Sequence, residues 1–247
     1  MKTIFGHRSI RKYKSDPVSE ATLEKILLAG TRASNTGNMQ VYSIVVTTDA
    51  ALREKLSPCH FGQPMVMQAP VVITFCADVR RFSQWCRLRG AEPEYDNFQW
   101  FVCGAIDAVL ASQNVALEAE ANGLGICFLG TTTYTADRII DVLQLPTGVV
   151  PVTTLVLGYP DENPSLADRL PLAGIVHREI YRDYTDANIE RIWEAREASD
   201  ETKNLLEVNQ LPNLAQIFTL RRYKGGDNIA FSRVYLNVLK RQGFMNQ

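Results

Sequence analysis

Apolar residues recur with helical spacing soon after the amino terminus. In "DPVSEATLEKILLAGTRAS", Leu23, Ile26 and Gly30 follow one another at intervals of three and four residues, which is typical of an amphipathic helix. Ser19 can accept a hydrogen bond from a backbone N–H as the N-cap, and Glu20 stands where the helix dipole favours a negative charge. A helix is therefore predicted from Glu20, followed by the polar loop "NTGNMQ".

Two β-rich runs come next, separated by a short predicted helix over Arg53–Leu56. The first run covers Val41–Thr48 and the second covers Val71–Cys76. Because the second run is continuously apolar, it predicts a strand covered on both faces.

The middle of the chain is dominated by one long apolar segment, Asn97–Ala121, which lacks proline and has glycine only at position 104. This pattern predicts a long central helix that ends at Gly123 and Gly125. The elements predicted after it are a buried strand over Ile126–Leu129, a helix over Thr135–Leu143 and a strand over Val152–Leu157. Because strands and helices do not alternate cleanly, the order favours an α+β fold with a mixed sheet and helices on both sides.

The pattern changes from Tyr184 onward. "TDANIERIWEAREASDETKNLLE" predicts one charged helix with a narrow apolar stripe, "RRYKGGDN" predicts a cationic turn, and "FSRVYLNVLKRQGF" predicts a closing amphipathic helix. We therefore divide the chain into residues 1–183 and a C-terminal helical extension, residues 184–247, within the same domain.

Composition narrows the possible classes of function. The 26 basic and 27 acidic side chains give a net charge of -1, so no domain-wide basic excess predicts nucleic-acid binding. The five cysteines form no CxxC pair, which indicates neither a disulfide framework nor a zinc site. No apolar run reaches the roughly 18 to 20 residues of a membrane span. A reduced cytoplasmic protein that binds no metal, nucleic acid or membrane is expected.

Against this balance, "HRSIRKYK" (7–14) concentrates positive charge. In an extended segment His7, Ser9 and Arg11 would share one side, where they could donate hydrogen bonds to a phosphate or to the carbonyl edge of a polar ring. A solvated arm is the alternative interpretation.

The glycines of "GLGICFLG" (123–130) do not form a dinucleotide-binding motif. That motif requires a strand before its glycines and a helix after them, whereas a helix precedes and a strand follows this stretch. Gly123 is interpreted as the end of the central helix. Gly130, at a strand end, would let backbone amides approach a flat ligand.

The chain offers few reactive groups of its own. His60 and His177 have no partners at metal-binding spacing, and only Cys59 beside His60 suggests a nucleophile, an alternative we rank low because adjacent loop residues seldom orient a base onto a thiol. A protein with anion donors but no acid, base or metal can take its reactive group from a cofactor.

Five ordered segments together resemble the FMN-dependent nitroreductases, in particular their NADPH-linked nitroreductase and flavin reductase branch. The resemblance covers about 170 residues and departs from the family at Val41 and Tyr42, where proline and tryptophan are usual, and at Ala167, where close relatives have lysine. The segments are "HRSIRKY", "ASNTGNMQVYS", "GQPMVMQAPVVITFCAD", "EANGLGICFLGT" and "NPSLADRLP".

The resemblance implies a three-layer αβα fold around a mixed, mainly antiparallel sheet, in an interlocked homodimer with FMN at the interface. Arg11 would face the N1/O2 edge of the flavin, Asn35 would reach it from the opposite subunit, and Arg169 would close on its phosphate. The implied FMN-binding residues are His7, Arg8, Ser9, Arg11, Asn35, Asn38, Gln63, Phe128, Leu129, Gly130, Thr131 and Arg169.

The implied activity is ping-pong hydride transfer from NADPH or NADH, through FMN, to nitroaromatics, quinones or flavins. Arg221, Arg222 and Lys224 are candidates for recognising the 2′-phosphate of NADPH, with a solvated turn as the alternative. A flavin-binding sensor or storage protein without turnover is the alternative function.

Overall fold

The computed structural model describes residues 2–247, which form two compact units. The first unit contains the chain up to residue 165 together with 231–247, and the second contains 166–230. These units do not coincide with the predicted domains 1–183 and 184–247, so the domain boundary stays a prediction.

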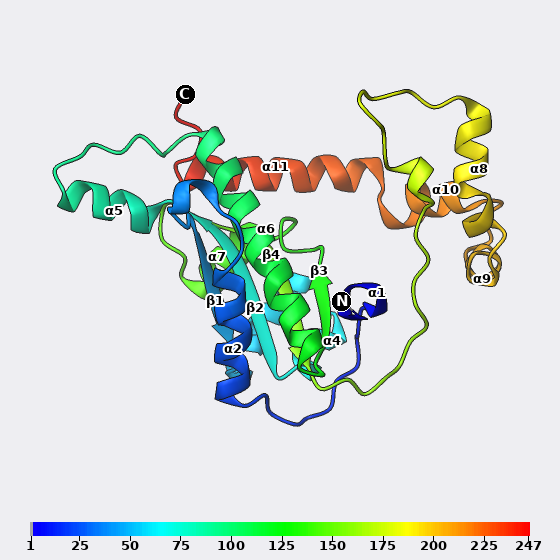
Figure 1. The fold of residues 1–247 in the computed structure, drawn as a ribbon, viewed down its shortest axis with the longest axis horizontal. Helices are drawn as coiled ribbons and strands as arrows, with labels where there is room; N and C mark the ends of the chain where they lie inside the picture. Colours follow the sequence, from blue (N-terminus) through cyan, green and yellow to red (C-terminus); the bar gives the residue numbers. More distant parts are fainter. Residues whose placement is uncertain (1) are drawn as a thin grey trace. The chain divides into compact units, whose positions relative to one another are not determined.

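A four-stranded sheet forms the centre of the first unit, in the order β1-β2-β4-β3 (Figure 1). All three strand pairs are antiparallel, and a parallel bridge between Ser9 and Ile126 makes the sheet mixed. All eight residues of β2 are buried, which confirms the prediction of a strand covered on both faces. The strands are β1 (Tyr42–Thr47), β2 (Val71–Asp78), β3 (Gly125–Leu129) and β4 (Val149–Gly158).

The long helix α6 (Phe98–Ala121) covers one face of the sheet, and α2 (Glu20–Thr31) packs beside it. Both helices begin where the sequence predicts, because Ser19 caps α2 and the Asn97 side chain accepts from the N–H of Trp100. α6 approaches the sheet closely, since a Cβ on Gly104 would lie 2.8 Å from the carbonyl oxygen of Val41.

The other face of the sheet is covered by three short helices, α3 (Ala50–Leu56), α4 (Pro64–Gln68) and α7 (Ala136–Leu143). Alternation along β2 supplies both layers, because Ile73 and Phe75 join the cluster under α2 and α6 while Val72 joins the cluster under the short helices. The three-layer αβα arrangement with a mainly antiparallel sheet is therefore confirmed.

By length and composition alone, α6 would also suit a membrane span, with a mean hydropathy of 1.4 over 18 residues. Its contacts with β2, β4 and α2 account for that composition, because a helix packed between a sheet and a second helix needs apolar residues on much of its surface.

Beyond the sheet, the charged segment after residue 184 is two helices, which corrects the single predicted helix. α8 (Asp186–Glu197) ends before Ser199, whose side chain caps α9 (Asp200–Asn209). A serine that accepts a backbone N–H starts a new helix more readily than it continues an old one, and the apolar stripe alone does not reveal this break.

The predicted turn "RRYKGGDN" and the helix after it also differ from prediction. Phe218–Arg222 forms a π-helical turn (η4), and Gly225 already begins α11 (Gly225–Arg241). The glycine pair therefore starts a helix and does not form an open turn. The remaining helical elements are α1 (Lys2–Gly6), η1 (Thr36–Asn38), η2 (Ser57–His60), α5 (Arg80–Leu88), η3 (Leu172–Gly174) and α10 (Leu214–Ile217).

Candidate functional site

The cationic segment after α1 runs parallel to β3 at the edge of the sheet. The N–H of Ile10 donates to the carbonyl oxygen of Ile126 at 2.8 Å, and Ser9 forms the parallel bridge to the same residue. A Cβ on Gly125 would collide with Ile10 at 2.7 Å, so this glycine permits the close approach. The segment from His7 to Arg11 is thereby fixed beside the strand that leads into Phe128–Thr131.

Two glutamates surround this segment. Glu120, at the end of α6, contacts His7 Nδ1 at 2.7 Å, and Glu162 accepts the backbone N–H groups of Arg11 and Lys12. Because an imidazole has two nitrogens, the contact with Glu120 leaves His7 Nε2 for a ligand.

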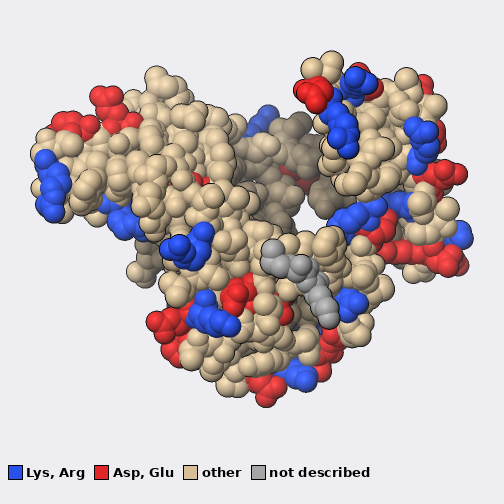
Figure 2. All heavy atoms as spheres, in the orientation of Figure 1, with Lys and Arg blue, Asp and Glu red and all other residues tan. Residues whose placement is uncertain are grey.

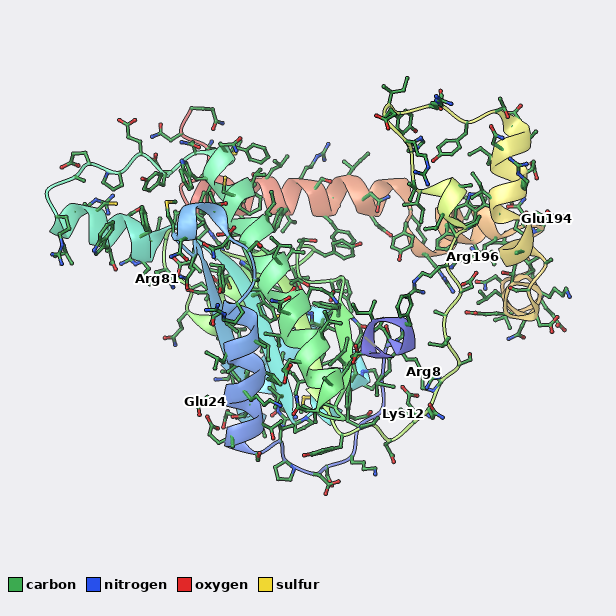
Figure 3. All side chains as sticks on the ribbon, in the orientation of Figure 1. Arg8, Lys12, Glu24, Arg81, Glu194 and Arg196 are labelled. Carbon is green, nitrogen blue, oxygen red and sulfur yellow. The ribbon has the colours of Figure 1, made fainter. Side chains whose placement is uncertain are left out.

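Arg8 lies on the segment that follows α1 (Figure 3). It donates from NH1 to Asn163 Oδ1 at 2.8 Å, while its Nε is buried without a partner among the described residues. A buried guanidinium N–H without an acceptor is costly, which favours an anionic ligand at this position.

A second group of predicted residues gathers where β3 ends. Gln63 Nε2 lies 3.5 Å from Thr131 Oγ1, and His60 Nδ1 lies 2.8 Å from the same oxygen. Gly130 is exposed, and a Cβ added to it would meet nothing within 4 Å. Phe128 is half-buried and Leu129 is buried. His7–Arg11, Gln63 and residues 128–131 therefore share one edge of the sheet.

An aromatic cluster lies next to this loop. The ring of Tyr134 stacks on Phe231 of α11 with centroids 4.3 Å apart and an angle of 4° between the rings, and Phe61 lies 6.1 Å from Phe231. These contacts restrict the movement of residues 131–134 relative to the segment that carries Gln63.

Asn35 and Asn38 lie in a separate loop that leads into β1. Gly37, Asn38 and Gln40 all have left-handed backbone angles, with φ of 56°, 55° and 53°. Such angles are unfavourable for residues other than glycine and occur preferentially at functional sites. Asn35 Oδ1 accepts the N–H of Gln40 at 3.3 Å.

Two buried or anchoring side chains hold this loop. Arg81, which projects from α5 (Figure 3), donates to the carbonyl oxygens of Gln40 and Tyr42. Asp107, buried in α6, accepts from the N–H of Thr36 at 2.9 Å. The unfavourable angles are therefore maintained by contacts from two helices.

The two groups lie at opposite edges of the sheet. The Asn35 loop precedes β1, whereas His7–Arg11 and Thr131 flank β3. Three strand spacings of about 4.8 Å separate these edges by roughly 14 Å. Within the first unit, one chain does not bring Asn35 and Asn38 to the remaining predicted residues.

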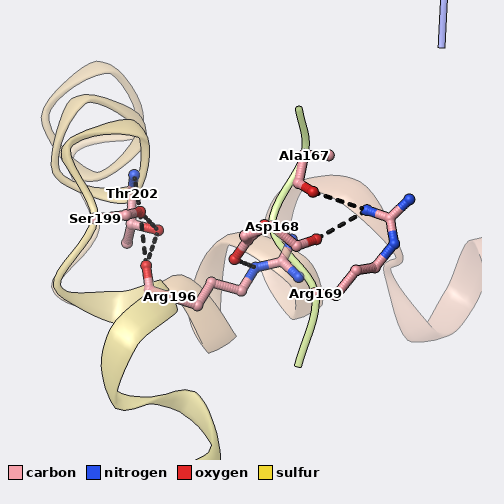
Figure 4. Close-up of polar contacts among 6 residues, drawn as sticks. All are labelled: Ala167, Asp168, Arg169, Arg196, Ser199 and Thr202. Carbon is pink, nitrogen blue, oxygen red and sulfur yellow. Dashed lines mark hydrogen bonds and ion pairs between the residues drawn. The ribbon is translucent and has the colours of Figure 1, made fainter. Parts of the chain in front are cut away.

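Arg169 belongs to the second unit. Its NH1 donates to the carbonyl oxygens of Ala167 and Asp168, at 3.3 and 2.8 Å (Figure 4). It lines a pocket of about 680 Å³ together with Arg182 and Arg191. The remaining guanidinium N–H groups are not engaged by the described residues of this unit, so they suit an anion.

The other predicted cations of the second unit, Arg221, Arg222 and Lys224, are all exposed. The Arg222 guanidinium lies 5.4 Å from the centre of the Phe218 ring, a cation–π distance. On the face shown in Figure 2, positive and negative side chains are interspersed among the described residues.

The thiol alternative does not fit the geometry. Cys59 is buried, its Sγ donates to the carbonyl oxygen of Lys55 at 3.7 Å, and burial raises the pKa of this thiol. His60 is hydrogen-bonded to Thr131 instead, so no base activates the sulfur. No cluster of potential metal ligands occurs among residues 2–247.

Sequence reasoning missed several residues that hold the site, among them Asp107, Arg81 and His60. Asp107 could have been noticed as a carboxylate within an apolar helix, but Arg81 and His60 carry no sequence signal, since their roles depend on residues 41 and 71 positions away.

Comparisons with known proteins identify the family of this chain. The profile of the nitroreductase family matches residues 4–159. The chain is 35% identical over 182 residues to the oxygen-insensitive NADPH nitroreductase of Salmonella typhimurium, covering 74% of each chain. It is 32% identical over 188 residues to the FMN reductase (NADPH) of Bacillus subtilis, covering 75% of this chain and 76% of that one.

Among solved structures, a Bacteroides fragilis chain described as an oxidoreductase has 49% identity and a TM-score of 0.98, with full coverage of both chains. The fold and the relatives together define an α+β oxidoreductase. The chain belongs to the nitroreductase family.

Proposed function

We propose that this chain binds FMN along the β3 edge of its sheet and transfers hydride from NADPH, through the flavin, to a small-molecule acceptor. The observation that carries the proposal is that two groups of donors lie along β3, with His7–Arg11 beside the start of the strand and Gln63 and Thr131 just beyond its end. FMN has a phosphate at one end and a polar ring edge at the other, and these two groups of donors match its two ends.

The phosphate end corresponds to His7, Arg8 and Ser9. The buried, unpartnered Arg8 Nε is a donor that an anion would satisfy, and charge-assisted hydrogen bonds of this kind are the stronger ones. Arg169 supplies a further guanidinium to the phosphate in this proposal.

The ring end corresponds to Arg11, Gln63 and the segment 128–131. The open space over Gly130 leaves room for a flat ring against the backbone. Arg11 is exposed and follows Ile10, which pairs with β3. Burial raises the pKa of the Cys127 thiol in β3, and the positive charge of Arg11 opposes that rise. A guanidinium near the ring stabilises negative charge that develops on reduction.

Bound flavin supplies the redox chemistry, since it accepts a hydride from a nicotinamide and passes electrons to an acceptor. The residues around it bind, orient and tune the ring. We infer a ping-pong order in which NADPH donates, its oxidised form leaves, and a nitroaromatic, quinone or flavin enters the same open face.

The site is completed in a homodimer, with Asn35 and Asn38 supplied by the second copy. Two observations support this. First, the Asn35 loop lies at the edge of its own sheet that is opposite to β3. Second, α6 exposes a row of apolar side chains at helical spacing. These are Ile106, Val109 and Leu110, which are 54%, 48% and 41% exposed. A symmetric contact between two copies would bury such a row.

NADPH preference and FMN affinity depend on the second unit in this proposal. Arg221, Arg222 and Lys224 are exposed donors available for a 2′-phosphate. Ala167 replaces a cation, which we expect to weaken FMN binding by about 1 to 3 kcal/mol, so that FMN is partly lost on dialysis.

The five free cysteines support a reducing, cytoplasmic location.

The test is anaerobic reduction of the FMN-loaded protein. NADPH and NADH are added separately, and the absorbance of oxidised flavin is followed. Rapid bleaching, reversed by a nitroaromatic or quinone, is the expected result. Bound flavin that neither nucleotide reduces would favour the sensor or storage alternative, and failure to bind FMN would refute the proposal.

A further inference from the structure

His60 is a fully buried side chain next to the flavin site that no part of the proposed reaction uses. It ends η2, three residues before Gln63, and its Nδ1 lies 2.8 Å from Thr131 Oγ1. Gln63 Nε2 approaches the same oxygen at 3.5 Å. Thr131 therefore joins η2 and the start of α4 to the end of β3.

The ring of His60 is neutral near pH 7, because burial lowers its pKa to about 4. A neutral imidazole carries one hydrogen, on either Nδ1 or Nε2. Nε2 is buried and has no hydrogen-bond partner among the described residues. A hydrogen on Nε2 would leave a buried N–H unsatisfied, which native structures rarely tolerate, so the hydrogen belongs on Nδ1, where Thr131 accepts it.

This assignment determines what the Thr131 hydroxyl can do. A hydroxyl has two lone pairs and one hydrogen. The N–H groups of His60 and Gln63 occupy the lone pairs, and no described residue accepts from the Thr131 hydroxyl. Its hydrogen is left for a ligand on the open side, beside Gly130.

We propose that His60 is a positioning residue that holds the Thr131 hydroxyl as a hydrogen-bond donor toward the bound flavin ring. The inference rests on the proposed function for the identity of the ligand. The orientation of the donor is a property of this chain alone. A threonine without His60 could turn its hydrogen toward another acceptor, and the ring would then lose a preorganised donor.

The first experiment uses the FMN-free wild-type protein, so that it is independent of the proposed function. The ¹⁵N chemical shifts of the His60 ring are measured by NMR at pH 7. A hydrogen on Nδ1 is the expected result. A hydrogen on Nε2, or a protonated ring, would overturn the proposal whatever the enzyme does.

The second experiment is a double-mutant cycle on the FMN-loaded protein, with His60→Leu, Thr131→Val and the double variant. FMN affinity and the midpoint potential of the flavin are measured. His60→Leu is expected to weaken FMN binding about fivefold to tenfold, the equivalent of one hydrogen bond of about 1 kcal/mol. The same substitution in the Thr131→Val background is expected to change neither quantity further.

Additive effects in this cycle would show that His60 acts by packing alone, which would refute the positioning role. His60→Asn, whose side-chain amide can donate to Thr131, is expected to restore the FMN affinity lost in His60→Leu, while Thr133→Val is the matched control with a half-buried threonine. If wild-type protein binds no FMN, the proposed function fails while the NMR result stands. If the wild-type protein binds FMN and the flavin is reduced by NADPH, an additive mutant cycle refutes the positioning role of His60 and leaves the proposed function intact.

Discussion

Arg11 combines an exposed side chain with a fixed backbone, because Glu162 accepts its N–H and Ile10 beside it pairs with β3. The guanidinium is thus placed without being neutralised by an ion pair, since the described residues offer it none within 4 Å. This combination suits a side chain whose charge acts on a ligand.

Replacing Arg11 by glutamine is expected to lower the midpoint potential of bound FMN by roughly 10 to 30 mV, the two-electron equivalent of about 0.5 to 1.4 kcal/mol. The physical reason is loss of a positive charge that stabilises the reduced ring. Redox titration of the holoprotein measures it. Lys12→Gln, which removes a neighbouring exposed cation, is the control, and an equal shift in both variants would contradict a specific role for Arg11.

His60 also predicts how stability depends on pH. Its pKa is about 4 in the folded chain and near 6.5 when unfolded. Between these values the unfolded state binds the extra proton, so the free energy of unfolding falls as the pH falls, by at most about 3 kcal/mol. Above pH 6.5 the residue contributes no pH dependence.

Urea unfolding of wild type and His60→Asn at pH 7, 5.5 and 4.5 isolates this contribution, because the carboxylates titrate in both proteins. The difference in unfolding free energy between the two should change in favour of the asparagine variant as the pH falls. A pH-independent difference would contradict the burial of a neutral ring.

At the scale of elements, α6 determines both the core and the site. It packs against the sheet through small residues such as Gly104, holds the Asn35 loop through Asp107, and places Glu120 against His7. Its N-cap Asn97 sets where this helix starts. A shift of α6 relative to the sheet would therefore displace both groups of site residues.

Gly104→Ala is expected to lower the free energy of unfolding by about 1 to 3 kcal/mol, because the new methyl group would lie 2.8 Å from the Val41 carbonyl and 3.0 Å from the Ala77 Cβ. The matched control is Gly226→Ala in α11, where nothing lies within 4 Å and the better helix propensity of alanine is expected to stabilise by up to about 1 kcal/mol. Both are measured by urea denaturation. Equal effects would contradict the tight helix–sheet contact.

At the scale of the whole molecule, the central question is whether two chains share each site. If Asn35 acts on the flavin bound by the other chain, a mixed dimer of Arg11→Gln and Asn35→Ala chains has one doubly defective site and one intact site. Co-expression with two different tags allows this mixed dimer to be purified.

The mixed dimer is expected to recover about half of the wild-type activity, since one site in two is intact, while each homodimeric variant stays impaired. If both residues act within a single chain, every site carries a defect and the mixed dimer recovers nothing. Size-exclusion chromatography with light scattering measures the oligomeric state of each preparation.

Most elements of the first unit could be predicted from the sequence by itself. Periodicity identified α2, α6 and the four strands, because helices and strands impose different spacings on residues that face a core. The capping residue Ser19 and the left-handed Gly123, with φ of 79°, also follow from local chemistry. The cationic segment and the resemblance to the nitroreductase family could also be recognised from short motifs, because the order of these motifs is a property of the sequence alone.

Only the tertiary structure decided which residues of the site meet. The start of α11 at a glycine pair contradicts local propensity. The pairing of His60 with Thr131, the anchoring of Gln40 by Arg81, and the separation of the Asn35 loop from β3 arise from strand order, which brings distant segments together or apart. The pattern of residues along the sequence reflects the local conformational preference of each residue. These contacts instead join residues far apart in the sequence, so they depend on how the whole chain folds.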